Sequence, residues 1–270
     1  MTACPITFLS DYGHADEFAG LCRAVIARVA PGVRVIDLTH GIRGHAVAEG
    51  AAVLARALPY TPPGVHLAVV DPGVGSTRRA VALRVADDDR VLVGPDNGLL
   101  LPAAERLGGV LAAVDVSLSP FRLEPVSATF HGRDVFAPVA ARLAAGETLA
   151  DAGEAVDPGS LIAPETSVPR MTEGGVVAHV VYLDRYGNAA LDLGGDRLGE
   201  AGLKLGHRAR VAAGQISLDA VYSLTFGDVS PGELILYEDS YGSLALAVNR
   251  GNAAEALELA PGAEVTVRPA

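Results

Sequence analysis

Residues 69–79, VVDPGVGSTRR, interrupt an apolar run with a carboxylate, a Pro-Gly pair and a second glycine before two arginines. Residues 66–70 predict a short buried strand, which Pro72 and Gly73 end. Asp71 then lies at the carboxyl end of that strand, where open α/β sheets bind their ligands. Two interpretations stay open from these residues alone. Asp71 is either a site carboxylate beside Arg78, or a loop aspartate that caps its own turn and pairs with Arg78.

The first half of the chain alternates predicted strands and helices around this stretch. We expect strands at 6–10 and 33–38 and helices at 16–29 and 46–58, the pattern of a parallel sheet. Residues 80–85 and 90–93 flank a short acidic turn and predict a hairpin. Asp16 and Asp134 are each expected to cap a helix, the latter at 135–145.

The second half reads as short strands joined by turns, which predicts a small antiparallel sandwich or barrel. We expect strands at 176–182, 203–211, 233–237, 244–248 and 264–268. Between the halves, prolines and scattered polar residues indicate a linker. The expected organisation is an α/β domain over residues 1–150, a linker over 151–175 and an all-β domain over 176–270.

Composition narrows the class of protein. With 270 residues, 50% of them hydrophobic, and a mean hydropathy of +0.31, the chain has ample material for a core. Cys4 and Cys22 lie in no metal-binding cluster, and no signal peptide or membrane span is recognisable, so we expect a cytoplasmic protein that does not act at a membrane. A net charge of −11 argues against a nucleic-acid partner.

Several common catalytic and cofactor motifs are missing. Arg78 stands where a dinucleotide-binding fingerprint needs its third glycine, and neither a P-loop nor a GxSxG motif occurs. Polar groups at sheet edges remain, namely Asp11, Asp71 with Arg78, and His131 with its neighbours. Aspartates and a histidine at strand ends also suit a metal-dependent hydrolase built on Asp11, Asp71 and His131, although no HxH, HExxH or DxD pattern supports it.

A set of motifs in colinear order resembles a known family, the S-adenosyl-L-methionine (SAM) hydroxide adenosyltransferases, relatives of fluorinating and chlorinating enzymes. The resemblance covers essentially the whole chain and rests on FLSDYG at 8–13, VVDPGVGSTRR at 69–79, GPDNG at 94–98, TFHGRD at 129–134, DRYGN at 184–188 and NRGNA at 249–253.

The resemblance implies an amino-terminal α/β/α sandwich, a carboxy-terminal barrel-like domain, and a homotrimer with sites at subunit interfaces. Its reaction is attack of water on the ribose C5′ carbon of SAM, which releases adenosine and L-methionine without a metal or other cofactor. In the first domain the resemblance implies that Asp11 holds the ribose hydroxyls, while Asp71, Arg78 and His131 place and activate the water.

The resemblance assigns the remaining substrate contacts to the second domain. Asp184 and Ser240 are implied to hold the amino-acid end of methionine, and the adenine contacts are Tyr186, Asn188, Phe226 and the backbone near Arg250. Turn chemistry alone also explains 184–188 and the similar turn at 239–243.

Departures from the halogenating relatives favour water over halide. Asp71 and Gly132 stand where those relatives carry Tyr and Ser, and only a short turn stands where they have an extra loop, between residues 85 and 90. Their tryptophan aligns with His45 in a chain without Trp. A carboxylate repels fluoride or chloride but can orient water. SAM hydrolysis is therefore the expected function, and the alternatives are a metal-dependent hydrolase, a halide-dependent adenosyltransferase and a non-catalytic adenosyl-ligand protein.

Overall fold

The chain forms two compact units, residues 1–165 and 166–270. A computed structural model describes residues 3–165, 167–197 and 199–270. The division falls inside the segment 151–175 that was expected as a linker, but this segment is not devoid of regular structure. Its beginning contributes β7 (Glu154–Val156) to the first sheet, and its end contributes β8 (Arg170–Thr172) to the second.

A mixed sheet with the order β2-β1-β3-β5-β4-β6-β7 is the centre of the first unit. Strands β2, β1, β3 and β5 run parallel, whereas β4 is antiparallel to both of its neighbours, so β4 and β5 form the expected hairpin. Besides β7, its strands are β1 (Ile6–Ser10), β2 (Val35–Thr39), β3 (Val65–Val69), β4 (Ala80–Val85), β5 (Val91–Pro95) and β6 (Val110–Asp115).

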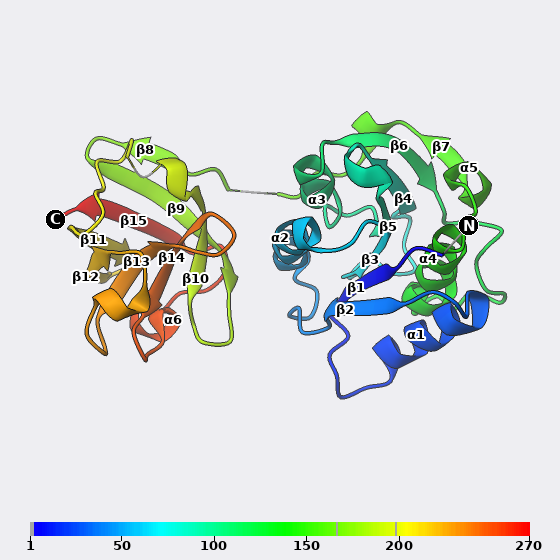
Figure 1. Ribbon diagram of the computed structural model, residues 1–270, viewed down its shortest axis with the longest axis horizontal. Helices are drawn as coiled ribbons and strands as arrows, with labels where there is room; N and C mark the ends of the chain where they lie inside the picture. The colour runs from blue at the N-terminus through cyan, green and yellow to red at the C-terminus, as the bar shows by residue number, and fades with distance from the viewer. Residues whose placement is uncertain (1–2, 166, 198) are drawn as a thin grey trace. The chain divides into compact units, whose positions relative to one another are not determined.

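Helices cover both faces of this sheet and make the expected α/β/α sandwich (Figure 1). Side chains of α1 (Phe18–Val29) and α4 (Ala137–Ala144) pack in one core with one face of β1 and β3. Those of α2 (Val47–Ala57) and α3 (Leu101–Arg106) pack in another core with the opposite face. A short α5 (Leu149–Ala152) precedes β7. Strands β1 and β3 are buried at every position, as strands covered on both faces must be.

Both expected aspartate caps are wrong. Helix α1 begins after Glu17 without any side-chain cap, so Asp16 lies one residue too early. Asp134 lies inside a π-helical turn, η3 (Gly132–Phe136), which leads into α4. Its buried carboxylate accepts hydrogen bonds from the backbone N–H of Ser127 at 2.8 Å and from the Arg133 guanidinium at 2.6 Å. Asp134 therefore closes the preceding loop rather than starting the helix.

The second unit is a seven-stranded barrel with one extra strand. The sheet order β10-β14-β13-β12-β11-β15-β9-β8 is closed by pairing of β9 with β10, and all pairs except β12 with β13 are antiparallel. Besides β8, its elements are β9 (Gly175–Leu183), β10 (Ala189–Gly194), β11 (Arg208–Ala213), β12 (Ile216–Tyr222), β13 (Leu234–Glu238), β14 (Ser243–Val248), α6 (Ala253–Ala256) and β15 (Glu264–Pro269).

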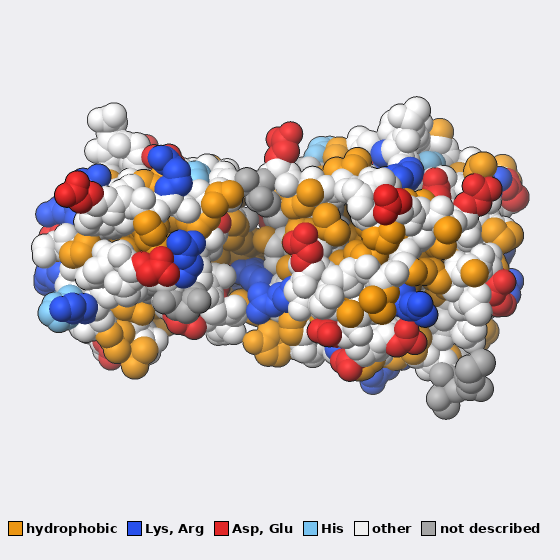
Figure 2. Space-filling model, turned by 90° about the horizontal axis from the view of Figure 1, so that it is seen from above, with side chains coloured by type: hydrophobic (Ala, Val, Ile, Leu, Met, Phe, Trp, Pro, Cys, Tyr) orange, Lys and Arg blue, Asp and Glu red, His pale blue; other side chains and the backbone are white. Residues whose placement is uncertain are grey.

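The barrel differs from the expected strand set in two ways. Strands β10 and β12 were not expected, and the expected strand at 203–211 begins only at Arg208, because the residues before it form a turn through Gly206. Acidic and basic side chains are interspersed over the face shown in Figure 2. None of the helices that the structure describes is long and apolar enough to cross a membrane.

Gly75 is required by both its backbone angle and its surroundings. Its φ is +77°, and a Cβ there would lie 2.4 Å from the Ala128 carbonyl oxygen. We therefore expect Gly75→Ala to lower the free energy of unfolding by about 2–4 kcal/mol, measured by urea denaturation and circular dichroism. Gly13→Ala is the matched control, because Gly13 has a φ of +69° but nothing within 4 Å. The control should lose only about 1 kcal/mol, and equal losses would show that the Ala128 contact is unimportant.

Candidate functional site

The carboxyl ends of β1 and β3 carry the centre of the candidate site. The strands pair in parallel with Ser10 opposite Val69, and the N–H of Asp11 donates to the Val69 carbonyl. The residues that follow, Asp11-Tyr12 and Val70-Asp71, therefore leave the sheet side by side. This is the edge at which the sequence predicted a ligand.

The turn after β3 folds back so that Arg78 reaches Asp71. The N–H of Val74 donates to the Asp71 carbonyl, and the Ser76 hydroxyl donates to the Gly73 carbonyl at 2.7 Å. The Ser76 hydroxyl oxygen in turn accepts the N–H of Arg78 at 3.2 Å. These local bonds set the conformation of residues 71–78.

Asp71 and Arg78 form a buried, bidentate ion pair. Arg78 Nε donates to Asp71 Oδ1 at 2.8 Å, and Nη2 donates to Oδ2. The two side chains are only 6% and 9% exposed, respectively. Within the described residues, the Asp71 carboxylate accepts hydrogen bonds from Arg78 alone, so it does not cap its own turn. A planar guanidinium held on two oxygens fixes the direction of the remaining carboxylate lone pairs.

His131 completes the group through the same guanidinium nitrogen that bonds Asp71 Oδ2. The same Nη2 donates to His131 Nδ1 at 3.0 Å. A guanidinium has no acceptor, so Nδ1 must be unprotonated and the neutral ring carries its hydrogen on Nε2. Burial, and next the positive charge of Arg78, hold the pKa of His131 below its ordinary value. His131 is therefore a neutral hydrogen-bond donor at pH 7.

Phe136, in the π turn that follows His131, supports this arrangement. The Arg78 guanidinium carbon lies 5.2 Å from the centroid of the Phe136 ring, a cation–π distance. Asn97, which the sequence analysis did not single out, donates from Nδ2 to the Val70 carbonyl at 2.9 Å. It thereby fixes the backbone next to Asp71, and its place in the GPDNG motif was the only available signal.

Asp11 has one oxygen committed to the protein. Its Oδ2 accepts the N–H of His45 at 2.9 Å, and His45 has a φ of +67°, which is uncommon for a non-glycine residue. Asp11 Oδ1 has no hydrogen-bond partner among the residues that the structure describes. Asp11 thus has a carboxylate oxygen that can accept a hydrogen bond from a ligand.

The predicted residues of the second unit lie on its turns. The Asp184 carboxylate accepts from the backbone N–H groups of Tyr186 and Asn188 and from the Asn188 side chain, at 2.8, 2.9 and 2.8 Å. These bonds agree with the turn-chemistry interpretation of this segment. Tyr186 is 66% exposed, and the Arg185 guanidinium carbon lies 5.5 Å from the centroid of its ring.

Phe226 lies beside Tyr237, a residue that the sequence analysis missed. Their ring centroids are 5.2 Å apart, and Phe226 is 40% exposed. Burial raises the pKa of Tyr237 to about 12, and the charges of Asp184 and Asp239 act in the same direction. Since such charges act over short range, Asp184, Phe226 and Tyr237 belong to one neighbourhood of the barrel.

Ser240 and Arg250 occupy two other turns of the barrel. Ser240 follows Asp239, whose carboxylate accepts the N–H groups of Tyr241 and Ser243 at 2.8 and 3.0 Å. Arg250 follows β14 with a φ of +56°. The structure thus gathers Asp71, Arg78 and His131 in one unit, and it places the predicted adenine and methionine residues on turns of the other.

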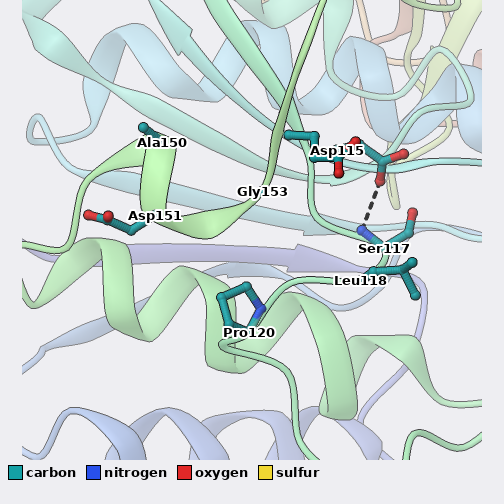
Figure 3. A pocket seen from close by; sticks show the side chains of 8 residues that line it. Asp115, Ser117, Leu118, Pro120, Ala150, Asp151 and Gly153 are labelled. Atoms are coloured by element: carbon teal, nitrogen blue, oxygen red, sulfur yellow. Dashed lines mark hydrogen bonds between the residues drawn. The ribbon is translucent and has the colours of Figure 1, made fainter.

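A surface cavity of about 350 Å³ lies elsewhere in the first unit (Figure 3). Asp115, Asp151 and Glu154 contribute to its lining, and the Asp115 carboxylate accepts the N–H of Ser117 at 2.8 Å. None of the predicted site residues lines it. Across residues 3–165, 167–197 and 199–270, no group of three His, Cys, Asp or Glu side chains is arranged to hold a metal ion.

Known proteins similar to this chain agree with the resemblance read from its motifs. Residues 6–153 match the SAM hydroxide adenosyltransferase N-terminal domain, and residues 178–266 match the C-terminal domain of the same family. A protein of Salinispora tropica named (R)-S-adenosyl-L-methionine hydrolase is 51% identical, with 97% of each chain covered. A protein of Thermus thermophilus with the same name is 39% identical, covering 97% of this chain and 98% of its own.

More distant relatives and a solved structure complete the comparison. A fluorinase of Actinoplanes sp. is 29% identical over 98% of this chain and 97% of its own. The crystal structure of an uncharacterized conserved protein from Thermotoga maritima superposes with a TM-score of 0.91 at 34% identity, covering 97% of this chain and 99% of that one. The chain belongs to the SAM hydroxide adenosyltransferase family.

Proposed function

We propose that this protein hydrolyses SAM to adenosine and L-methionine. The observation that carries the proposal is the buried Asp71–Arg78 ion pair, bonded to His131, at the carboxyl edge of β1 and β3. The hydrolase names of the relatives at 39–51% identity support the same reaction. No observation on the described chain favours the metal-dependent, halide-dependent or non-catalytic alternatives.

The chemistry joins an electron-rich oxygen to a cationic sulfonium. As the water oxygen forms its bond to C5′, the C5′–S bond breaks, methionine leaves with the electron pair, and one water proton must be removed. Charge is lost on the way to the transition state, so a site that excludes bulk water favours it. A carboxylate cannot deprotonate water fully before attack, because the pKa of water is about 15.7. Asp71 therefore orients the water and draws its proton as the new bond forms.

His131 and Arg78 assist by electrostatics. The Nε2–H of neutral His131 is left to donate toward the oxygen as it becomes hydroxide-like, and the positive charge of Arg78 stabilises that oxygen. Arg78 does not have to move during the reaction, because Asp71 and the Phe136 ring already hold its guanidinium in place.

Substrate binding is shared between both units in this proposal. Asp11 binds the ribose hydroxyls through its unoccupied oxygen, while Asp184 and Ser240 hold the amino-acid end of methionine. Tyr186, Phe226, Asn188 and the backbone near Arg250 bind the adenine. The proposal includes the homotrimer with interface sites that the family resemblance implies.

Product analysis in labelled water tests the function directly. With SAM in ¹⁸O-water, we expect equimolar adenosine and L-methionine, with one ¹⁸O atom at the 5′ position of adenosine detected by mass spectrometry. EDTA should leave the rate unchanged. Unlabelled adenosine, or a rate abolished by EDTA and restored by a divalent ion, would contradict this mechanism.

Asp71→Asn tests the base. The amide keeps the volume and one acceptor for Arg78 but cannot take a proton, so kcat should fall by about 10²–10⁴-fold while SAM binding measured by calorimetry changes little. Asp219→Asn is the control, because it removes the charge from an exposed Arg–Asp pair of 3.1 Å on the barrel and should retain full activity. Unchanged kcat in Asp71→Asn would remove Asp71 from the mechanism.

The acid limb of the pH profile should report His131. Its pKa is lowered from 6.5, so the ring stays neutral until the pH falls below 6.5. Protonation then places a hydrogen on Nδ1 opposite the Arg78 N–H, which breaks their bond and lowers kcat. In His131→Asn the amide oxygen can replace Nδ1 as acceptor without titrating, so this limb should disappear. A limb above pH 6.5, or one that persists in the variant while circular dichroism shows a folded protein, would rule out this assignment.

A further inference from the structure

Tyr12 points its ring into the same edge of the sheet as the catalytic group. It follows Asp11, and the β1–β3 register that pairs Ser10 with Val69 brings residue 12 level with residue 71. Its ring centroid lies 5.9 Å from that of Phe18 and 5.8 Å from that of Phe130. These rings, together with the bond from the Tyr12 N–H to the Ser10 hydroxyl, hold the side chain in place.

The Tyr12 hydroxyl fills the space that a side chain at position 132 would occupy. A Cβ built on Gly132 would lie 1.9 Å from Tyr12 Oη and 3.0 Å from Cζ. Gly132 has no positive φ, so this position excludes larger residues by space rather than by backbone angle. Because Gly132 directly follows His131, the Tyr12 oxygen lies against the backbone of the catalytic group.

This hydroxyl makes no hydrogen bond within the part of the chain that the structure describes, and the side chain is partly buried. The oxygen is not one of the fully buried atoms that lack a partner among the described residues, so a water or a ligand can reach it and form that bond. Burial raises the pKa of Tyr12 above its ordinary range, and the nearby charges of Asp11 and Asp71 add to this. The phenol therefore keeps its proton at any working pH and can act only as a neutral hydroxyl.

We propose that Tyr12 donates a hydrogen bond to the water that attacks SAM and so takes part in the reaction beside Asp71, Arg78 and His131. The inference rests on the proposed hydrolysis. The oxygen of a developing hydroxide accepts more than one hydrogen bond, so Tyr12 and His131 Nε2 stabilise it together. The water proton goes to Asp71, the new bond forms to C5′ as C5′–S breaks, and Tyr12 keeps its own proton throughout.

Tyr12→Phe removes the hydroxyl and leaves the ring among its aromatic neighbours. Loss of one donor to the developing charge should lower kcat by about 10–100-fold, with KM for SAM within about twofold of wild type. A raised KM with unchanged kcat would mean that the hydroxyl binds substrate instead, and unchanged kcat and KM would mean that it does nothing. Either result overturns the proposal.

A pair of double variants separates the effect of the hydroxyl group from the effect of side-chain volume at position 132. In Tyr12→Phe/Gly132→Ser, the serine hydroxyl is attached to a Cβ that lies 1.9 Å from the former position of the phenol oxygen. Tyr12→Phe/Gly132→Ala has the same Cβ without the hydroxyl, and both meet the same tight contact with Cζ of the phenylalanine. We expect the serine variant to have several-fold higher kcat than the alanine variant at equal thermal stability. Equal kcat values would count against a hydroxyl requirement.

A crystal structure with adenosine and methionine gives a readout that does not depend on turnover. A water should lie within about 2.6–3.2 Å of Tyr12 Oη and also of an Asp71 oxygen in the wild type, and Tyr12→Phe should lose it. Absence of that water overturns the proposal. If the wild type does not hydrolyse SAM, the proposed function itself is wrong. If the wild type is active and Tyr12→Phe is equally active, only the role of Tyr12 is wrong.

Discussion

The site depends on one buried ion pair, Asp71 with Arg78. Two charges removed from water are tolerated only when they are well paired, and here both carboxylate oxygens receive a guanidinium hydrogen. The turn that brings Arg78 back to Asp71 must be tight. This explains why a glycine packs against the Ala128 carbonyl at position 75 and why the Ser76 hydroxyl bonds within the turn. Removing either charge would leave the other buried without its countercharge, so the pair fixes the geometry of the side chains that touch it.

Local sequence patterns were sufficient for the elements that surround this pair. The strand before Asp71 is a continuous apolar run ended by Pro72, and such runs identify strands covered on both faces. The strand-helix alternation in the first half likewise predicted the sandwich. Both signals are local, so a single sequence contains them.

Other features depend on contacts that no local pattern encodes. The sequence predicted Asp134 as a helix cap, but its carboxylate bonds Ser127 and Arg133. Asp134 itself lies inside the π-helical turn that begins at Gly132. The parallel pairing of β12 with β13 is likewise a property of barrel closure rather than of either strand. Tyr12 was overlooked for the same reason, since its meaning comes from Gly132, which is remote in sequence. The motifs predicted the group of Asp71, Arg78 and His131 by family resemblance, whereas its bonding order became visible only in three dimensions.

That bonding order separates this group from a serine-protease type of relay. In such a triad the imidazole lies between the carboxylate and the nucleophile and carries the proton. Here Arg78 lies between Asp71 and His131, and Nη2 occupies the lone pair of Nδ1. No proton can pass from the imidazole to the carboxylate through a guanidinium, because Arg is not deprotonated in proteins. In the proposed mechanism the carboxylate therefore receives the water proton directly, while His131 and Arg78 act through charge and hydrogen bonding. Such a division of labour suits a reaction whose leaving group needs no proton, because methionine departs as a neutral thioether.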